Sequence, residues 1–158
     1  KQNELIASQL RDQFPESPYA VFAALAQAKH YADSQQYLDA QKALVWASEH
    51  AKTGVPELMP LVALRIAKLQ FLQADYTSAI ATLDSSKDSG EFSAEYLELK
   101  GDIFLAQGKI SMATQAYSES IKALEKSGFH EKKQDVELKL SNLPASDISA
   151  APVQGGNS

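Results

Sequence analysis

One pattern of small and large residues occurs three times along this chain, each time on two helical segments joined by a short polar turn. In each copy one small residue precedes the turn and another follows it, at Ala28, Ala67 and Gly101 and at Ala40, Ala79 and Ala113. Small side chains let two helix backbones approach where they cross, and larger neighbours fill the space beside the crossing. The pattern therefore predicts three helical hairpins.

The spacing of the copies indicates a tandem repeat. Tyr37, Tyr76 and Ile110 each follow a turn, and the last two are 34 residues apart. That is the period of tetratricopeptide (TPR) repeats, whose hairpins stack on one another. The first interval is 39 residues, and the excess falls around residues 53–57, between hairpins, where an insertion leaves the packed faces intact. An ordinary helical bundle with alanines at its crossings is the alternative.

Turn residues and prolines divide the chain into elements. Helices are expected over residues 3–13, 18–34, 37–51, 58–72 and 76–83, then over the hairpin 94–124 and around 136–143. Gly54 is predicted to cap the third helix, and the charged residues 130–135 are predicted to be a connector. The expected fold is all-α: a TPR-like α-solenoid of about three hairpins with flanking N- and C-terminal helices over residues 1–143. Residues 144–158 are small and polar, and we expect a disordered tail.

Composition narrows the function. The net charge of -5 provides no basic excess for nucleic acid, and the chain has no cysteine for disulfide or thiolate chemistry. No run of about 18 apolar residues is present, so no transmembrane span is expected within it. The sequence begins at Lys1 within a helical pattern. We therefore expect it to be part of a longer protein with any membrane anchor upstream.

Nothing in the sequence forms a catalytic pattern. His30 with Asp33 is half of a metal site at most, and a solvated helix end explains the pair better. His50 lies near the end of a helix, where a cation suits the helix dipole. Gly108-Lys109 lacks the other residues of a phosphate-binding loop. The prediction is a protein that is not an enzyme and has no catalytic residue, metal or cofactor.

Four short segments carry a resemblance to a known family. They are P-x-S-P-Y at residues 15–19, L-R-x-A-K at 64–68, L-x-G-D-x-x-L-A-x-G at 99–108, and the closing residues Leu140, Asn142 and Leu143. These segments resemble the periplasmic TPR-like domain of the YfgM family, the ancillary subunits of the SecYEG translocon. The resemblance extends over about residues 5–143.

The resemblance implies a location and partners. Members of the family are single-span proteins with this domain on the periplasmic side of the bacterial inner membrane. It implies association with the SecYEG translocon and a PpiD-like periplasmic chaperone, and assistance to nascent exported proteins, secreted or destined for the outer membrane. A structural module that mainly mediates homo-oligomerisation, for instance as a homodimer, is the alternative function.

The first helix of each TPR hairpin lines a concave groove, which predicts where a partner binds. The groove positions are Phe22, Lys29, Leu61, Lys68, Phe71, Glu95, Glu98 and Asp102. Lys29 and Lys68 hold the same repeat position, and Asp102 holds it in the third repeat. A groove that is basic at one end and acidic at the other suits a helix or an extended peptide. The alternative is that the flanking helices fill it.

Two features at the N-terminal end leave a choice open. Trp46 either packs against the N-terminal helix, which we favour, or is an exposed contact residue. Leu5, Ile6 and Leu10 either cap the first repeat or pair with another subunit.

Overall fold

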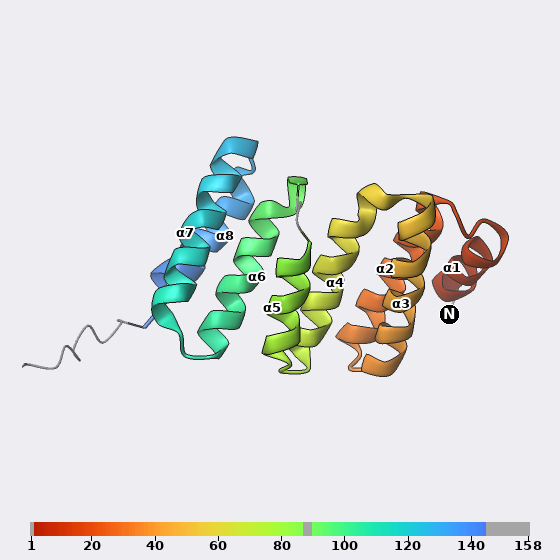
Figure 1. Ribbon diagram of the computed structural model, residues 1–158, viewed down its shortest axis with the longest axis horizontal. Helices are drawn as coiled ribbons and strands as arrows, with labels where there is room; N and C mark the ends of the chain where they lie inside the picture. Colours follow the sequence, from red (N-terminus) through yellow and green to blue (C-terminus); the bar gives the residue numbers. More distant parts are fainter. Residues whose placement is uncertain (1, 87–89, 145–158) are drawn as a thin grey trace, which may run out of the picture.

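The computed structural model describes residues 2–86 and 90–144, which form a row of helical hairpins (Figure 1). Its elements, in chain order, are α1 (Gln2–Gln13), α2 (Pro18–Asp33), α3 (Tyr37–Gly54), η1 (Pro56–Leu58), α4 (Met59–Leu72), α5 (Tyr76–Ser85), η2 (Gly90–Phe92), α6 (Ser93–Ala106), α7 (Ile110–Ser127) and α8 (His130–Ser141). The hairpins α2–α3, α4–α5 and α6–α7 stack side by side, with α1 against the first and α8 against the last. The predicted all-α solenoid is confirmed. Residues 87–89, and residues 145–158 of the tail predicted at 144–158, lie outside the described residues.

The three hairpin turns have one backbone geometry. Gln35, Ala74 and Gly108 occupy the same turn position, with φ of 59°, 58° and 73°. In each turn the next amide donates to a carbonyl five residues back, at 2.8–2.9 Å: Gln36 to Tyr31, Asp75 to Gln70, and Lys109 to Phe104. This 6→1 bond with a left-handed residue is the Schellman way of ending a helix. The repeated turns therefore confirm the register of the three repeats.

The helix crossings bury the repeated residues, as the sequence predicted. Ala28, Ala67 and Gly101 are buried, as are the alanines after the turns and the large residues Leu44, Leu83 and Tyr117. The third crossing differs in shape. The Tyr117 ring lies directly on Gly101, so that a Cβ placed there would be 2.5 Å from Cδ1 of the ring. The first two hairpins pack alanine and leucine at the same two positions, and the third packs glycine and tyrosine.

The second hairpin lacks the large aromatic ring that the other two carry three residues after the small one. Gln70 stands there, and its Oε1 accepts a 2.8 Å hydrogen bond from the Thr82 hydroxyl on α5.

The second hairpin is joined to the third by Tyr96, whose hydroxyl donates to the Pro60 carbonyl at 2.8 Å. Pro60 lies in the first turn of α4, where a missing amide proton costs no helical bond.

Two boundary predictions were wrong. Helix α3 continues through Gly54, which is not left-handed, and Val55 ends it. Gly54 is needed for close approach, because a Cβ there would lie 2.9 Å from the carbonyl oxygen of Glu16. Residues 130–135 are not a connector: α8 begins at His130, after the left-handed cap Gly128 of α7. Their charged side chains are mostly exposed, so the segment reads as polar although it is helical.

Helix α1 covers the first repeat through an unexpected face. Ala7 is buried, whereas Leu5 and Ile6 are 60% and 50% exposed. The Arg11 guanidinium lies 5.4 Å from the ring centre of Trp46, which stacks on His50 with 3.8 Å between centroids. Trp46 therefore packs against the N-terminal helix, as we favoured from the sequence.

The Gly101–Tyr117 contact can be tested by a double-mutant cycle. We expect Gly101→Ala to destabilise the chain by about 1–3 kcal/mol in urea unfolding, because the new methyl group overlaps the ring. In a Tyr117→Leu background the same change should cost much less, since alanine over leucine is the packing of the first two hairpins. An equal cost in both backgrounds would show that the ring contact does not determine the crossing.

Candidate interaction surface

A small pocket opens between the first helices of repeats one and two. Its volume is about 200 Å³, and its lining residues come from α2, α3 and α4: Ala28, Lys29, Ala32, Asp33, Leu44, Arg65, Lys68, Leu69 and Leu72. Two of the sequence-predicted groove residues, Lys29 and Lys68, are thus brought to one site. Alanine, leucine and the stems of the cationic side chains make its walls.

The cations of this pocket differ in their partners. Lys29 Nζ lies 2.5 Å from Asp33 Oδ2 on the next turn of α2, and both side chains are 60% exposed, which makes the pair weak. Arg65 and Lys68 have no ion pair within the part of the chain that the structure describes. Burial lowers the pKa of Lys68, and the neighbouring Arg65 cation lowers it further, whereas Glu98 and Glu95 act in the opposite direction.

The acidic residues of the third repeat are held by α8. Lys132 Nζ lies 2.5 Å from Glu95, and Lys139 Nζ lies 2.6 Å from Glu98 and 2.9 Å from Asp102. Glu95 and Asp102 are seven residues apart, as are Lys132 and Lys139, so α8 runs parallel to α6 and matches its charges. At this end the groove positions face a helix of the same chain.

Asp102 also connects the groove to the core. The Tyr117 hydroxyl donates a 2.7 Å hydrogen bond to Asp102 Oδ1. Burial, the Asp102 hydrogen bond and nearby carboxylates raise the pKa of Tyr117 far above its ordinary value. Burial by itself would lower the pKa of Lys139, but its bonds to Glu98 and Asp102 outweigh that effect and raise it. Tyr117, Asp102, Lys139 and Glu98 therefore form one network between α6, α7 and α8.

The apolar residues of the predicted groove are placed less uniformly. Phe22 is exposed on α2. The Phe71 ring packs 5.9 Å from that of Tyr76, and Leu61 packs partly buried on the core of the first hairpin. Among these three, Phe22 has the most surface to offer a partner.

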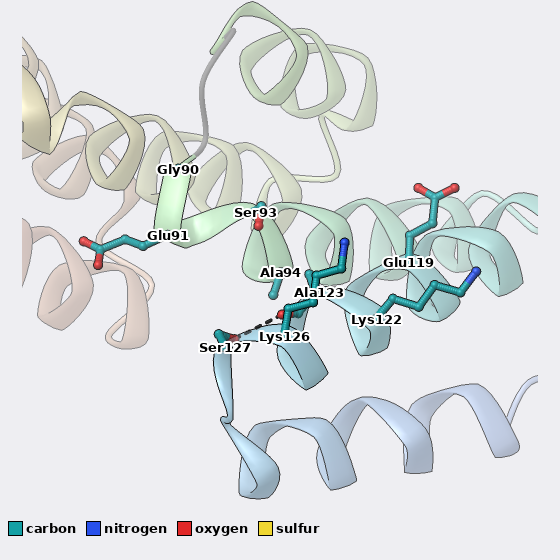
Figure 2. Close-up of a pocket in the computed structure, with 9 residues that line it drawn as sticks. All are labelled: Gly90, Glu91, Ser93, Ala94, Glu119, Lys122, Ala123, Lys126 and Ser127. Atoms are coloured by element: carbon teal, nitrogen blue, oxygen red, sulfur yellow. Dashed lines mark hydrogen bonds between the residues drawn. The ribbon is translucent and has the colours of Figure 1, made fainter.

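A second hollow lies where the start of α6 meets the last turns of α7 (Figure 2). Its volume is about 490 Å³, and its charged lining residues are Glu91, Glu119, Lys122 and Lys126. None of the sequence-predicted groove residues lines it. Two carboxylates and two ammonium groups leave it without a net charge, so it selects no ligand by charge.

The histidines and acidic residues of the described structure lack the geometry of a metal site. Within residues 2–86 and 90–144, no three His, Asp or Glu side chains converge as metal ligands. His50 Nδ1 is 2.8 Å from the Trp46 carbonyl oxygen, and His30 lies exposed beside Tyr31. None of the described helices combines the length and apolar character needed to cross a bilayer.

Three residues of this surface were missed by the sequence analysis. Arg65 precedes Lys68 by three positions, which places two cations on one helix face, and that spacing was a usable signal. Lys132 was missed because residues 130–135 were predicted to be a connector, and Lys139 because the helix predicted around 136–143 was not expected to lie along the groove. The matching spacing of seven residues in the acidic and basic pairs was the signal for them.

The stacked helical hairpins define a TPR-like domain, a class of repeat domain that presents extended binding surfaces. The sequence matches the tetratricopeptide repeat-like domain family over residues 1–145, and the chain belongs to that family. No solved structure matches it.

Several bacterial proteins named ancillary SecYEG translocon subunit are similar to this chain. That of Haemophilus influenzae is 32% identical over 125 residues, and that of Aggregatibacter actinomycetemcomitans is 34% identical over 125 residues; both alignments span 79% of this chain. That of Neisseria gonorrhoeae is 29% identical over 117 residues, or 74% of this chain. The aligned part is 54–58% of the relatives' own length.

The network around Asp102 predicts a loss of stability in alkali. The pKa of Lys139 is raised by folding, so its contribution is complete below about pH 10.4 and disappears as the pH rises through the folded value. Tyr117 stays neutral in the fold where an unfolded tyrosine ionises, so above about pH 10 folding loses up to about 1.4 kcal/mol per pH unit. We expect Tyr117→Phe to flatten the fall in urea stability between about pH 10 and 11.

The matched control is Tyr19→Phe, at a tyrosine that is exposed on α2. It should leave the alkaline slope of the parent chain unchanged. The same slope for the parent and Tyr117→Phe would contradict the assignment of the loss to this network.

Proposed function

We propose that this chain is the interaction domain of a translocon accessory protein on the periplasmic side of the bacterial inner membrane. The observation that carries the proposal is its similarity to three proteins named ancillary SecYEG translocon subunit, along three quarters of the chain. The proposed role is non-enzymatic. The TPR-like fold supports it, because stacked hairpins present a long surface to other polypeptides.

The proposed partners are the SecYEG translocon, a PpiD-like periplasmic chaperone and exported proteins as they emerge. The mechanism is scaffolding: a rigid solenoid holds one polypeptide close to another. The groove over repeats one and two is the proposed contact surface, since it carries the exposed Phe22 and the cations Lys29 and Lys68. Over repeat three the corresponding residues are paired with α8.

Self-association is the second candidate. The exposed Leu5 and Ile6 on one side of α1 support it, because neighbouring apolar side chains at one end of a solenoid suit contact with another copy. In that case the chain would act mainly as a homo-oligomerisation module, for instance in a homodimer.

Site-specific photo-crosslinking in inner-membrane vesicles separates these functions. A crosslinking amino acid at Phe22 or Leu72, in the complete protein, should capture a translocon subunit or a PpiD-like chaperone. The control position is Leu38 on α3, outside the groove, which is 73% exposed and so more accessible than Phe22 or Leu72. It should capture those partners at most one-fifth as often, a threshold of about 1 kcal/mol in preference.

The identity of the captured protein decides between the candidates. Crosslinks from Leu5 to a second copy, with no partner captured from the groove, would favour the self-association module. Equal capture of translocon subunits from Leu38 and Phe22 would place the working surface elsewhere.

A further inference from the structure

We infer that the pocket between α2 and α4 binds a side-chain carboxylate from an acidic peptide segment of a partner protein. The carboxylate would lie against Arg65 and Lys68, and an aliphatic neighbour in the peptide would lie against Leu72. The inference rests on the proposed function in one respect: it takes the groove over repeats one and two as the surface that meets polypeptides.

The charge of the pocket is opposite to that of the chain. Its lining holds three cations, Lys29, Arg65 and Lys68, and one carboxylate, Asp33, in a chain whose net charge is -5. Burial lowers the pKa of Lys68, and the repulsion from the Arg65 cation lowers it further. Two like charges held together at a partly buried site are unfavourable until an anion joins them.

The described carboxylates near the pocket are already engaged. Asp33 is paired with Lys29. Glu98 and Glu95 are close enough to influence Lys68, but they are bonded to Lys139 and Lys132 of α8. The pairing of these carboxylates with α8 thus leaves Arg65 and Lys68 without an ion-pair partner among the described residues.

The walls of the pocket determine what kind of carboxylate fits. Ala28, Ala32, Leu44 and Leu69 make it apolar, and Leu72 stands 52% exposed at its rim. A volume of about 200 Å³ is below the 300–1,000 Å³ of small-molecule sites. It suits one anchoring side chain of a longer segment. A glutamate would match the cations of the pocket, and an aliphatic residue beside it would match the apolar walls.

Arginine at this site favours a carboxylate. Its planar guanidinium binds both oxygens of one carboxylate, and Lys68 adds a point charge beside it. The Arg65 Nε is shielded from solvent and has no hydrogen-bond partner among the described residues. A polyphosphate such as nucleic acid would meet repulsion beyond the pocket, because the protein as a whole is acidic.

Fluorescence anisotropy with a defined peptide tests the inference. The probe is a fluorescein-labelled, C-terminally amidated peptide of about 12 residues in which glutamates alternate with leucines, and its control has glutamine for glutamate. We expect the chain to bind the glutamate peptide at least about tenfold more tightly, as charge-assisted hydrogen bonds require. Binding should weaken as salt is raised.

Two double variants with the same change of charge locate the site. Arg65→Gln with Lys68→Gln should weaken binding of the glutamate peptide about tenfold or more. Lys122→Gln with Lys126→Gln, in the hollow of Figure 2, should change it less than about twofold. Circular dichroism tests whether both double variants fold. If the Arg65/Lys68 double variant does not fold, the single variant Lys68→Gln takes its place.

Several results would overturn the inference. They are equal affinity for the glutamate and glutamine peptides, unchanged affinity in the Arg65/Lys68 variant, and displacement by inorganic phosphate as complete as by unlabelled peptide. Equally tight binding of a glutamine peptide with a free C-terminus would assign the pocket to a chain terminus instead. Peptide binding without translocon crosslinks would support the carboxylate pocket and refute the proposed function. Translocon crosslinks without peptide binding would support the proposed function and refute the carboxylate pocket.

Discussion

The contact between Gly101 and the Tyr117 ring determines how this solenoid ends. Gly101 on α6 has no side chain, which makes room for the Tyr117 ring on α7. The first two hairpins have leucine opposite alanine at these positions. The tyrosine brings a hydroxyl group to the edge of the core, and that hydroxyl holds Asp102. Asp102 in turn accepts a hydrogen bond from Lys139 of α8. The glycine–tyrosine packing in the core therefore positions a polar network at the surface.

This network makes the third repeat differ from the first two at the predicted groove positions. Over repeat three, α8 occupies the position that a further hairpin would take, and its lysines neutralise Glu95, Glu98 and Asp102. Over repeats one and two, the position equivalent to Asp102 is lysine, and the large core residue carries no hydroxyl group. There Arg65 and Lys68 line the pocket between α2 and α4. Of the predicted groove positions, those of the third repeat are paired with α8, and Lys29 and Lys68 line a pocket.

The repeat architecture was predictable because it depends on local spacing. The small residues, the large residues and the turn positions recur at fixed intervals, and the structure gives each turn the same hydrogen bond. Helix boundaries at Gly54 and His130 were not predictable in the same way. Gly54 is explained by the approach of Glu16, which is distant in sequence. The charged first half of α8 has no apolar pattern, so only its second half was predicted as a helix.

The candidate site shows the same limit. The repeat register placed Lys29 and Lys68 together correctly, since equivalent positions on stacked helices are neighbours. It gave no indication that α8 would pair with the acidic positions, because that depends on the return of the chain along α6. Arg65 does not occupy one of the predicted groove positions of its repeat, although its spacing of three residues from Lys68 places both cations on one helix face.

Amide chemical-shift mapping with the glutamate–leucine peptide would show whether α8 covers the third repeat and leaves the pocket between α2 and α4 free. We expect shifts concentrated in α2 and α4, around Lys29, Arg65 and Lys68, while α6 and α8 remain unchanged. Shifts concentrated in α6 and α8, or the release of α8 from Glu98 and Asp102 on binding, would contradict it.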